Sequence, residues 1–167
     1  SSSSSNGYGG AIRIDEPSTD YTKNNPIKIN NTKFSSNYIQ SEGSAFGGAV
    51  NVQREINFTN CVFVKNNATG NTDDNGNNDE AIGGAIYADN FWYKNLGGNQ
   101  YQTVGMDMYI INSTFDGNYI KVMKAYGSNE YPSLWGSTIS YGRGQSNSSP
   151  SAKTFIFNSI IRNSKIY

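Results

Sequence analysis

Two short motifs alternate along this chain, and they constrain its fold more than any other feature of the sequence. The first is Asn-x-x-Phe-x-x-Asn, and its last copy is degenerate. The four copies are Asn31-Phe34-Asn37, Asn60-Phe63-Asn66, Asn112-Phe115-Asn118 and the degenerate Asn158-Ile161-Ser164. Such regular recurrence is typical of a protein that stacks copies of one small unit, because a single unit is too short to bury its own apolar face.

The second motif is Gly-Gly-Ala followed by an aliphatic residue. Its copies are Gly9-Gly10-Ala11-Ile12, Gly47-Gly48-Ala49-Val50, Gly83-Gly84-Ala85-Ile86 and a weaker Gly136-Ser137-Thr138-Ile139. Successive glycine pairs are 38, 36 and 53 residues apart. Glycine tolerates positive φ and lets two backbones approach closely. The pairs therefore predict a tight corner or a close contact between successive units.

An alternating apolar run precedes each copy of the first motif. The runs are carried by Ile27 and Ile29, Ile56 and Phe58, Met108 and Ile110, and Thr154 and Ile156. A period of two indicates a strand with one buried face. Each unit thus contains two clear strands, with a third short strand after the Phe. We predict an all-β, right-handed parallel β-helix of about four coils, with equivalent strands about 4.8 Å apart.

The chain reads as one repeat region at 9–167 behind a polar N-terminal stretch at 1–8. Long loops are expected at about 67–80, 89–105 and 119–135. Open end coils expose unpaired strand edges, so solenoids need caps, and the final residues 165–167 carry no polar capping element. We expect the chain to be part of a longer solenoid or to stack end to end with copies of itself.

Charge and composition exclude several classes of function. The 13 Lys and Arg balance 13 Asp and Glu, which argues against nucleic acid or an anionic membrane as the main partner. The chain has no His, the commonest general base and transition-metal ligand. The lone Cys61 occupies the place of Thr32 and Ser113 in other copies, so we expect a packed thiol. No apolar run reaches the ~18 residues of a membrane helix.

Together the two motifs resemble the repeats of the chlamydial polymorphic outer membrane proteins and of similar right-handed parallel β-helix surface proteins. The resemblance covers the chain from about Gly9 to Ser164. It implies a surface-exposed β-helical passenger with adhesin-like behaviour, located on the cell surface or outside the cell. It leaves the organism and the secretion route open.

Loops on a rigid scaffold commonly carry function, and the expected loops are rich in aromatic residues. The candidates for contact with a protein or glycan are Phe91, Trp92, Tyr93, Tyr101, Tyr126, Tyr131 and Trp135. Their alternative role is to pack on the flank of the coil. Among the N-glycosylation sequons, those at Asn67 and Asn147 lie in expected loops, whereas Asn112 is a ladder position and is expected to be buried.

A metal site and an active site are the remaining alternatives. Asp73, Asp74 and Asp79 are weak calcium candidates. An EF-hand loop starting at Asn71 would place Ile82 where Glu is needed, and a solvated acidic loop is the favoured interpretation. No other cofactor is expected.

Acidic residues follow the Gly-Gly-Ala strands, and basic residues lie close to them in the sequence. These residues are Asp15, Glu16, Glu55 and Asp89, with Arg13 and Arg54 nearby. Carboxylates ~5–9 Å apart could hydrolyse a glycosidic bond, as in a polysaccharide lyase or hydrolase, but acids are also common at turns. We expect a non-enzymatic surface scaffold that binds a protein or glycan partner through its loops. A filament subunit is the first alternative and an enzyme the second.

Overall fold

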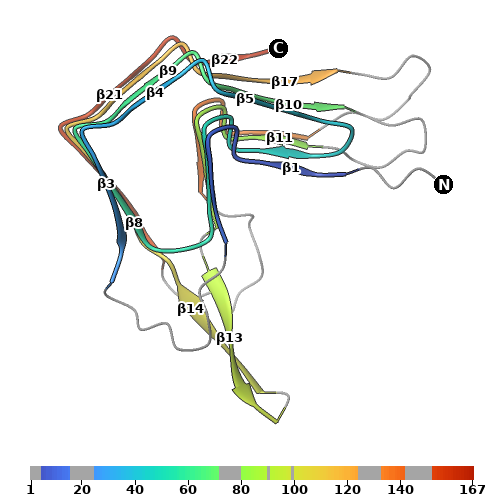
Figure 1. Cartoon of the computed structure of the whole chain (residues 1–167), viewed down its shortest axis with the longest axis vertical. Helices are drawn as coiled ribbons and strands as arrows, with labels where there is room; N and C mark the ends of the chain where they lie inside the picture. The colour runs from blue at the N-terminus through green and yellow to red at the C-terminus, as the bar shows by residue number, and fades with distance from the viewer. Residues whose placement is uncertain are drawn as a thin grey trace.

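The computed structural model of the protein describes residues 5–15, 25–71, 80–89, 91–98, 100–123, 133–141 and 152–167. Across these ranges the backbone forms strands and turns and no helix. The chain follows nearly the same path several times, and each pass lies on the previous one (Figure 1).

Five parallel sheets of four strands each make up the stack. Sheet A contains β1 (Gly7–Tyr8), β6 (Ala45–Phe46), β11 (Glu80–Ile82) and β18 (Ser133–Trp135). Sheet B contains β2 (Ile12–Ile14), β7 (Val50–Val52), β12 (Ile86–Ala88) and β19 (Ile139–Tyr141). Sheet C contains β3 (Ile27–Asn30), β8 (Ile56–Thr59), β15 (Met108–Ile111) and β20 (Thr154–Phe157). Sheet D contains β4 (Lys33–Ser35), β9 (Val62–Val64), β16 (Thr114–Asp116) and β21 (Ile160–Arg162). Sheet E contains β5 (Tyr38–Ser41), β10 (Asn67–Asn71), β17 (Tyr119–Met123) and β22 (Lys165–Ile166).

The chain visits sheets A to E in the same order in each pass, and we call the passes repeats 1 to 4. Repeat 1 runs from β1 to β5, repeat 2 from β6 to β10, repeat 3 from β11 to β17 and repeat 4 from β18 to β22. Equivalent residues pair in register, so that Ile29 lies beside Phe58 and Phe58 beside Ile110. The predicted parallel all-β stacking is confirmed and is compatible with a β-helix. Each repeat contributes five stacked strands, more than the two or three that the sequence predicts.

The stretches predicted as loops contain strands. The one at 89–105 is an antiparallel hairpin of β13 (Phe91–Gly97) and β14 (Gln100–Gly105), inserted between sheets B and C of repeat 3. It projects away from the stack (Figure 1). The stretches at 67–80 and 119–135 begin and end in strands of sheets E and A, because these segments pair with neighbouring repeats. Within a single repeat nothing in the sequence reveals that pairing.

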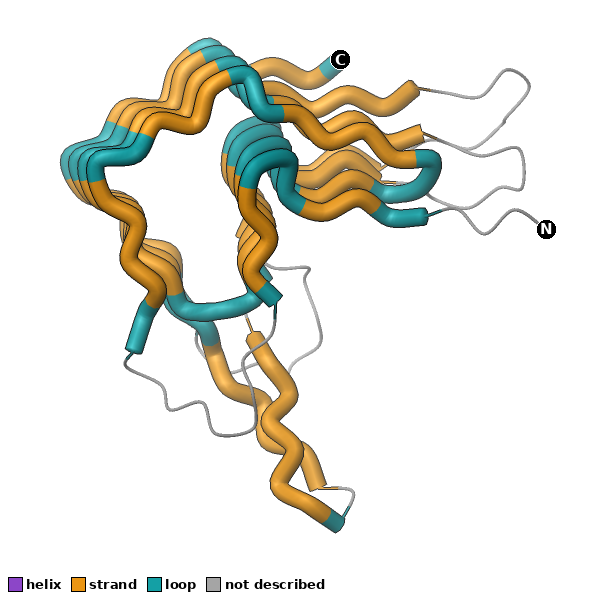
Figure 2. The backbone as a smooth tube through the Cα atoms, in the orientation of Figure 1, coloured by secondary structure: helices purple, strands orange, loops and turns teal. Residues whose placement is uncertain are grey.

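The main core lies inside sheets B, C and D. Phe63 is fully buried, and its ring lies 4.6 Å from that of Phe34 and 4.6 Å from that of Phe115. A smaller core between sheets A and E is built around Ala45, Ala68, Ala81 and Ile120. Figure 2 shows sheets A and E as an arm beside the larger enclosure of the other three sheets.

The two glycines of each pair serve different purposes at the corner between sheets A and B. Gly47 has φ 71°, and a Cβ there would lie 2.0 Å from the carbonyl oxygen of Val50. Gly48 instead needs space, because its Cβ would lie 2.0 Å from the carbonyl oxygen of Gly84 in the next repeat. Ser137 takes this second place in repeat 4, the last repeat that the structure describes.

The two asparagines of the Asn-x-x-Phe-x-x-Asn motif also differ. The first one turns the chain between sheets C and D with positive φ, 54° at Asn60 and 49° at Asn112. The prediction that Asn112 is buried is wrong: the residue is exposed, because its side chain stays outside the turn, where the Asn158 Nδ2 donates to its Oδ1 at 2.8 Å. The second asparagine is internal, and Asn66 and Asn118 are fully buried.

Candidate functional site

Variation in length is confined to two corners of the repeat. Sheets A and B, C and D, and D and E are joined by two or three residues in every repeat. The connections from B to C, however, span 15–26, 53–55, 89–107 and 142–153, and those from E to A span 42–44, 72–79 and 124–132. The outer face of the A–B corner lies between these two sets of connections (Figure 2).

The outer face of the A–B corner holds a cavity of about 200 Å³ that we call the corner groove. It is lined by Asn6, Tyr8, Phe46, Gln53, Tyr87 and Asp89, from repeats 1 to 3. Aromatic rings form its wall. Tyr8 stacks on Phe46 with ring centroids 5.2 Å apart, and Phe46 contacts Tyr87 at 5.1 Å. Phe46 and Tyr87 are buried, and the Arg13 guanidinium lies 4.4 Å from the Tyr8 ring centre.

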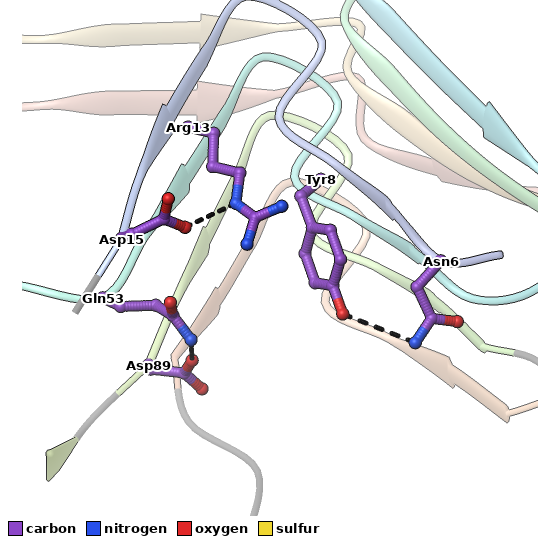
Figure 3. Close-up of polar contacts among 6 residues, drawn as sticks. All are labelled: Asn6, Tyr8, Arg13, Asp15, Gln53 and Asp89. Atoms are coloured by element: carbon purple, nitrogen blue, oxygen red, sulfur yellow. Dashed lines mark hydrogen bonds and ion pairs between the residues drawn. The ribbon is translucent and has the colours of Figure 1, made fainter. Parts of the chain in front are cut away.

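A polar row follows the ends of the sheet B strands. Asp15, Gln53 and Asp89 occupy equivalent positions in repeats 1, 2 and 3. The Gln53 Nε2 donates to Asp89 Oδ2 at 2.8 Å, and the Tyr87 hydroxyl donates to the other Asp89 oxygen. The Arg13 Nε donates to Asp15 Oδ1 at 2.5 Å. Figure 3 shows this row beside Tyr8 and Asn6.

The predicted catalytic residues are brought together only in part. Asp15 and Asp89 are two strand spacings apart, about 10 Å, and Gln53 separates them. Glu55 lies in the B–C connection, where its carboxylate and that of Asp107 add to the effect of burial in raising the pKa of the Tyr141 phenol. Arg54 lies in the same connection, and Glu16 lies outside the described residues.

Asn51 is a functional candidate that the sequence reading missed. It lies in register between Arg13 and Tyr87 on sheet B, and since Val50 and Val52 face the core, its side chain is on the side of the corner groove. The residue is 1% exposed, and within the described residues neither its Nδ2 nor its Oδ1 has a hydrogen-bond partner. Leaving a buried polar group unpaired costs about 1–3 kcal/mol. The only sequence signal is a polar residue inside a Val-Asn-Val strand.

The hairpin gathers four of the aromatic contact candidates. Phe91, Trp92 and Tyr93 are consecutive residues of β13, and Tyr101 lies in β14 opposite Asn95. Trp135 is elsewhere, at the end of β18 in sheet A. Tyr126 and Tyr131 lie outside the described residues.

The candidates for modification and metal binding are only partly described. Asn67 begins β10 and is half-buried, and its Oδ1 accepts a hydrogen bond from Thr69 Oγ1 at 3.1 Å. Asn147, Asp73, Asp74 and Asp79 lie outside the described residues. In the part of the chain that is described, no group of three or more metal-ligating side chains comes together. None of the described segments is a helix of the length and hydrophobicity that crossing a membrane requires.

Cys61 is placed as a structural thiol. It is buried, and its Sγ lies 3.3 Å from the carbonyl oxygen of Ile29 and 3.4 Å from that of Thr59. Burial raises its pKa, against smaller lowering by backbone hydrogen bonds. The backbone N–H of Cys61 donates to Ser113 Oγ at 3.1 Å, and Ser113 in turn donates its N–H to Ser159 Oγ. A small side chain at this position thus continues a ladder between repeats.

Comparisons with known proteins identify no relative of this chain. No protein-family model, no curated protein and no solved structure matches the chain.

Proposed function

We propose that this chain is a module of a right-handed parallel β-helix that works on the cell surface or outside the cell, and that it binds a protein or glycan partner. The observation that carries the proposal is the confinement of length variation to two corners, one of which bears the projecting hairpin. The stacked sheets hold the same geometry while the connections change. Connections on a rigid scaffold are where binding residues concentrate. The resemblance to chlamydial surface repeats supports an adhesin-like role.

The hairpin is the part of the module that we assign to partner contact. Three adjacent aromatic residues, Phe91 to Tyr93, lie in a strand that leaves the stack. Tyr and Trp provide much of the binding energy of protein interfaces, because they offer a large, rigid contact area.

The test exploits the short B–C connection of repeat 2. There a single residue, Arg54, separates Gln53 from Glu55, and the equivalents of those two residues in repeat 3 are Asp89 and Asp107. Replacing residues 90–106 by one arginine should therefore remove the hairpin while the stack persists. We expect binding to cultured cells and to immobilised matrix proteins or glycans to fall at least tenfold. Tyr38→Ser, at an exposed site on sheet E, is the control. Full binding without the hairpin would contradict the proposal, as would the absence of binding by the intact protein.

End-to-end stacking into a filament is a second candidate. Inward positions of repeat 4 are exposed, 46% at Ile156, 45% at Ile161 and 58% at Ile166, while their partners in repeat 3 are fully buried. Ser137 opposes it, because a Cβ at this place in the earlier repeats would collide with the next repeat. Electron micrographs of a concentrated solution of the protein test this candidate. Fibres that are present in the unsubstituted protein and absent in Ile161→Lys would favour the filament.

A polysaccharide lyase or hydrolase has the least support. The carboxylates of Asp15 and Asp89 are separated by the amide of Gln53, and both Asp89 oxygens already accept hydrogen bonds.

A further inference from the structure

We propose that the corner groove is a second binding site, separate from the hairpin, and that it takes a neutral sugar unit. Its volume of about 200 Å³ is below the ~300–1,000 Å³ of pockets for drug-sized ligands. It therefore suits a single ring of a larger chain. The lining residues come from three successive repeats, so the groove extends along the stack axis, and the neighbouring units of a glycan can continue in that direction.

The polar groups of the groove match hydroxyl groups. A sugar hydroxyl donates one hydrogen bond and accepts others. The Asp89 carboxylate has acceptor capacity left after its two hydrogen bonds, since each oxygen has two lone pairs. Gln53 holds a second N–H and a carbonyl oxygen beside it, because only one of its N–H groups is committed to Asp89.

These groups are held in place before any ligand arrives. Asp89 is fixed from both sides by Tyr87 and Gln53, and the buried rings of Phe46 and Tyr87 form a rigid wall behind it. Little side-chain freedom remains to be lost on binding, which favours affinity for a small ligand.

Asn51 is the independent sign of a ligand. Its amide is buried on the groove side of sheet B without a hydrogen-bond partner in the described structure. A hydroxyl group can accept from Nδ2 and donate to Oδ1 at once. Asn51 does not itself line the groove; Arg13 and Tyr87 lie beside it on the neighbouring strands of sheet B. The proposal therefore requires the half-exposed Arg13 side chain to move when the sugar binds.

The charges of the groove select against anionic sugars. Arg13 is paired with Asp15, so the charge of Asp89 is left uncompensated among the lining residues. A uronic acid would bring a second negative charge beside Asp89.

The experiment titrates the full chain with lactose, cellobiose and N,N′-diacetylchitobiose, and with digalacturonate as the anionic probe, followed by amide NMR shifts. We expect at least one neutral disaccharide to shift residues 6–8, 51–53 and 87–89, and digalacturonate to bind at least tenfold more weakly. Gln53→Ala and Asn51→Leu should each raise Kd at least tenfold. Gln40→Ala, an exposed residue of sheet E, should change it less than twofold.

Melting temperatures separate a ligand role of Asn51 from a structural one. Asn51→Leu removes an unpaired buried amide at nearly constant volume, so we expect an unchanged or higher melting temperature together with lost binding. The proposal would be overturned if none of the neutral disaccharides shifted these resonances, or if Gln53→Ala kept the affinity of the unsubstituted protein. A lower melting temperature of Asn51→Leu would also overturn it. The variant without the hairpin keeps Asp89 and should still bind the sugar, so the two proposals fail separately.

Discussion

Asn66→Ala tests whether the internal asparagine ladder holds the repeats together. The Asn66 side chain takes part in four hydrogen bonds that cross between repeats. Its Nδ2 donates to Asn118 Oδ1 at 2.9 Å and to the Phe34 carbonyl oxygen at 3.1 Å. Its Oδ1 accepts from the backbone N–H of Asn37 at 3.0 Å and from Asn37 Nδ2 at 2.9 Å. One amide thus connects repeat 2 to both of its neighbours.

The magnitude follows from the groups that the substitution leaves unpaired. Removing the amide leaves two backbone groups without a hydrogen-bond partner, namely the N–H of Asn37 and one acceptor site on the carbonyl oxygen of Phe34. Both lie in or beside the core. Each backbone group left unpaired costs about 1–3 kcal/mol, so we expect the free energy of unfolding to fall by about 4 kcal/mol. Asn118 Oδ1 keeps the backbone N–H of residue 66 as a donor and adds little.

Urea unfolding followed by circular dichroism measures this loss, as a shift of the midpoint at constant slope. Asn60→Gly is the matched control. The Asn60 Nδ2 also donates to an asparagine of the neighbouring repeat, Asn31 Oδ1 at 3.2 Å, but this hydrogen bond lies on the exposed surface. Glycine also accepts its φ of 54°. The control should lose less than about 1 kcal/mol. A loss below about 1 kcal/mol for Asn66→Ala, or equal losses in both variants, would refute the reasoning.

Three further predictions concern packing and titration. Gly48→Ala should lower the free energy of unfolding, measured by heat or urea, by more than about 3 kcal/mol, because the new Cβ would lie 2.0 Å from a backbone oxygen. Gly98→Ala is the control: a Cβ there has nothing within 4 Å, so the loss should be only about 1–2 kcal/mol, from the positive φ. Cys61→Ser should change stability by less than about 1 kcal/mol, because Ser113 fills the same ladder place, and iodoacetamide should label the thiol only when the chain unfolds, since burial raises its pKa. Hydrogen bonds from Asn163 and Arg162 of repeat 4 lower the pKa of the Asp116 carboxyl group. The small stabilisation that Asp116 gives to repeat 4 is therefore fully present above the ordinary pKa of about 3.9. It is lost as the pH falls through the lowered pKa of the folded protein. Carboxyl NMR should show that lowered pKa, and Arg162→Ala should raise it.

The sequence predicts sheets B and C well because both alternate apolar residues next to a recurring motif. Sheet A has no comparable signal in the sequence, and two strands of sheet E, β10 and β17, begin stretches that the sequence predicts as loops. The strands of these two sheets are as short as Ala45–Phe46, and they pack around alanines such as Ala68 and Ala81. Alanine fits inside or outside equally, so it leaves no alternating pattern. The hairpin had a usable signal: aromatic strand formers flank Gly97 and Gly98, which both adopt positive φ.

The candidate groove could be anticipated only in outline. Acids after the Gly-Gly-Ala strands suggested a row on one face, and Asp15 and Asp89 do lie in one row. The parts played by Gln53 and Asn51 depend on which residues become neighbours across repeats, and that register is absent from any single copy of the motif. The two asparagines of the motif likewise look alike in sequence, although only the second is buried.

The parallel register has a mechanical consequence. Hydrogen bonds between neighbouring strands of all five sheets run along the axis of the stack. Tension between the first and last strands would therefore open them one after another, as in a zipper, and would free one repeat at a time. Repeat 1 and repeat 2, of 38 and 36 residues, would each add about 130 Å of extended chain when freed, at roughly 3.5 Å per residue. Under load the module would behave as a tether that lengthens in steps and keeps its remaining repeats folded.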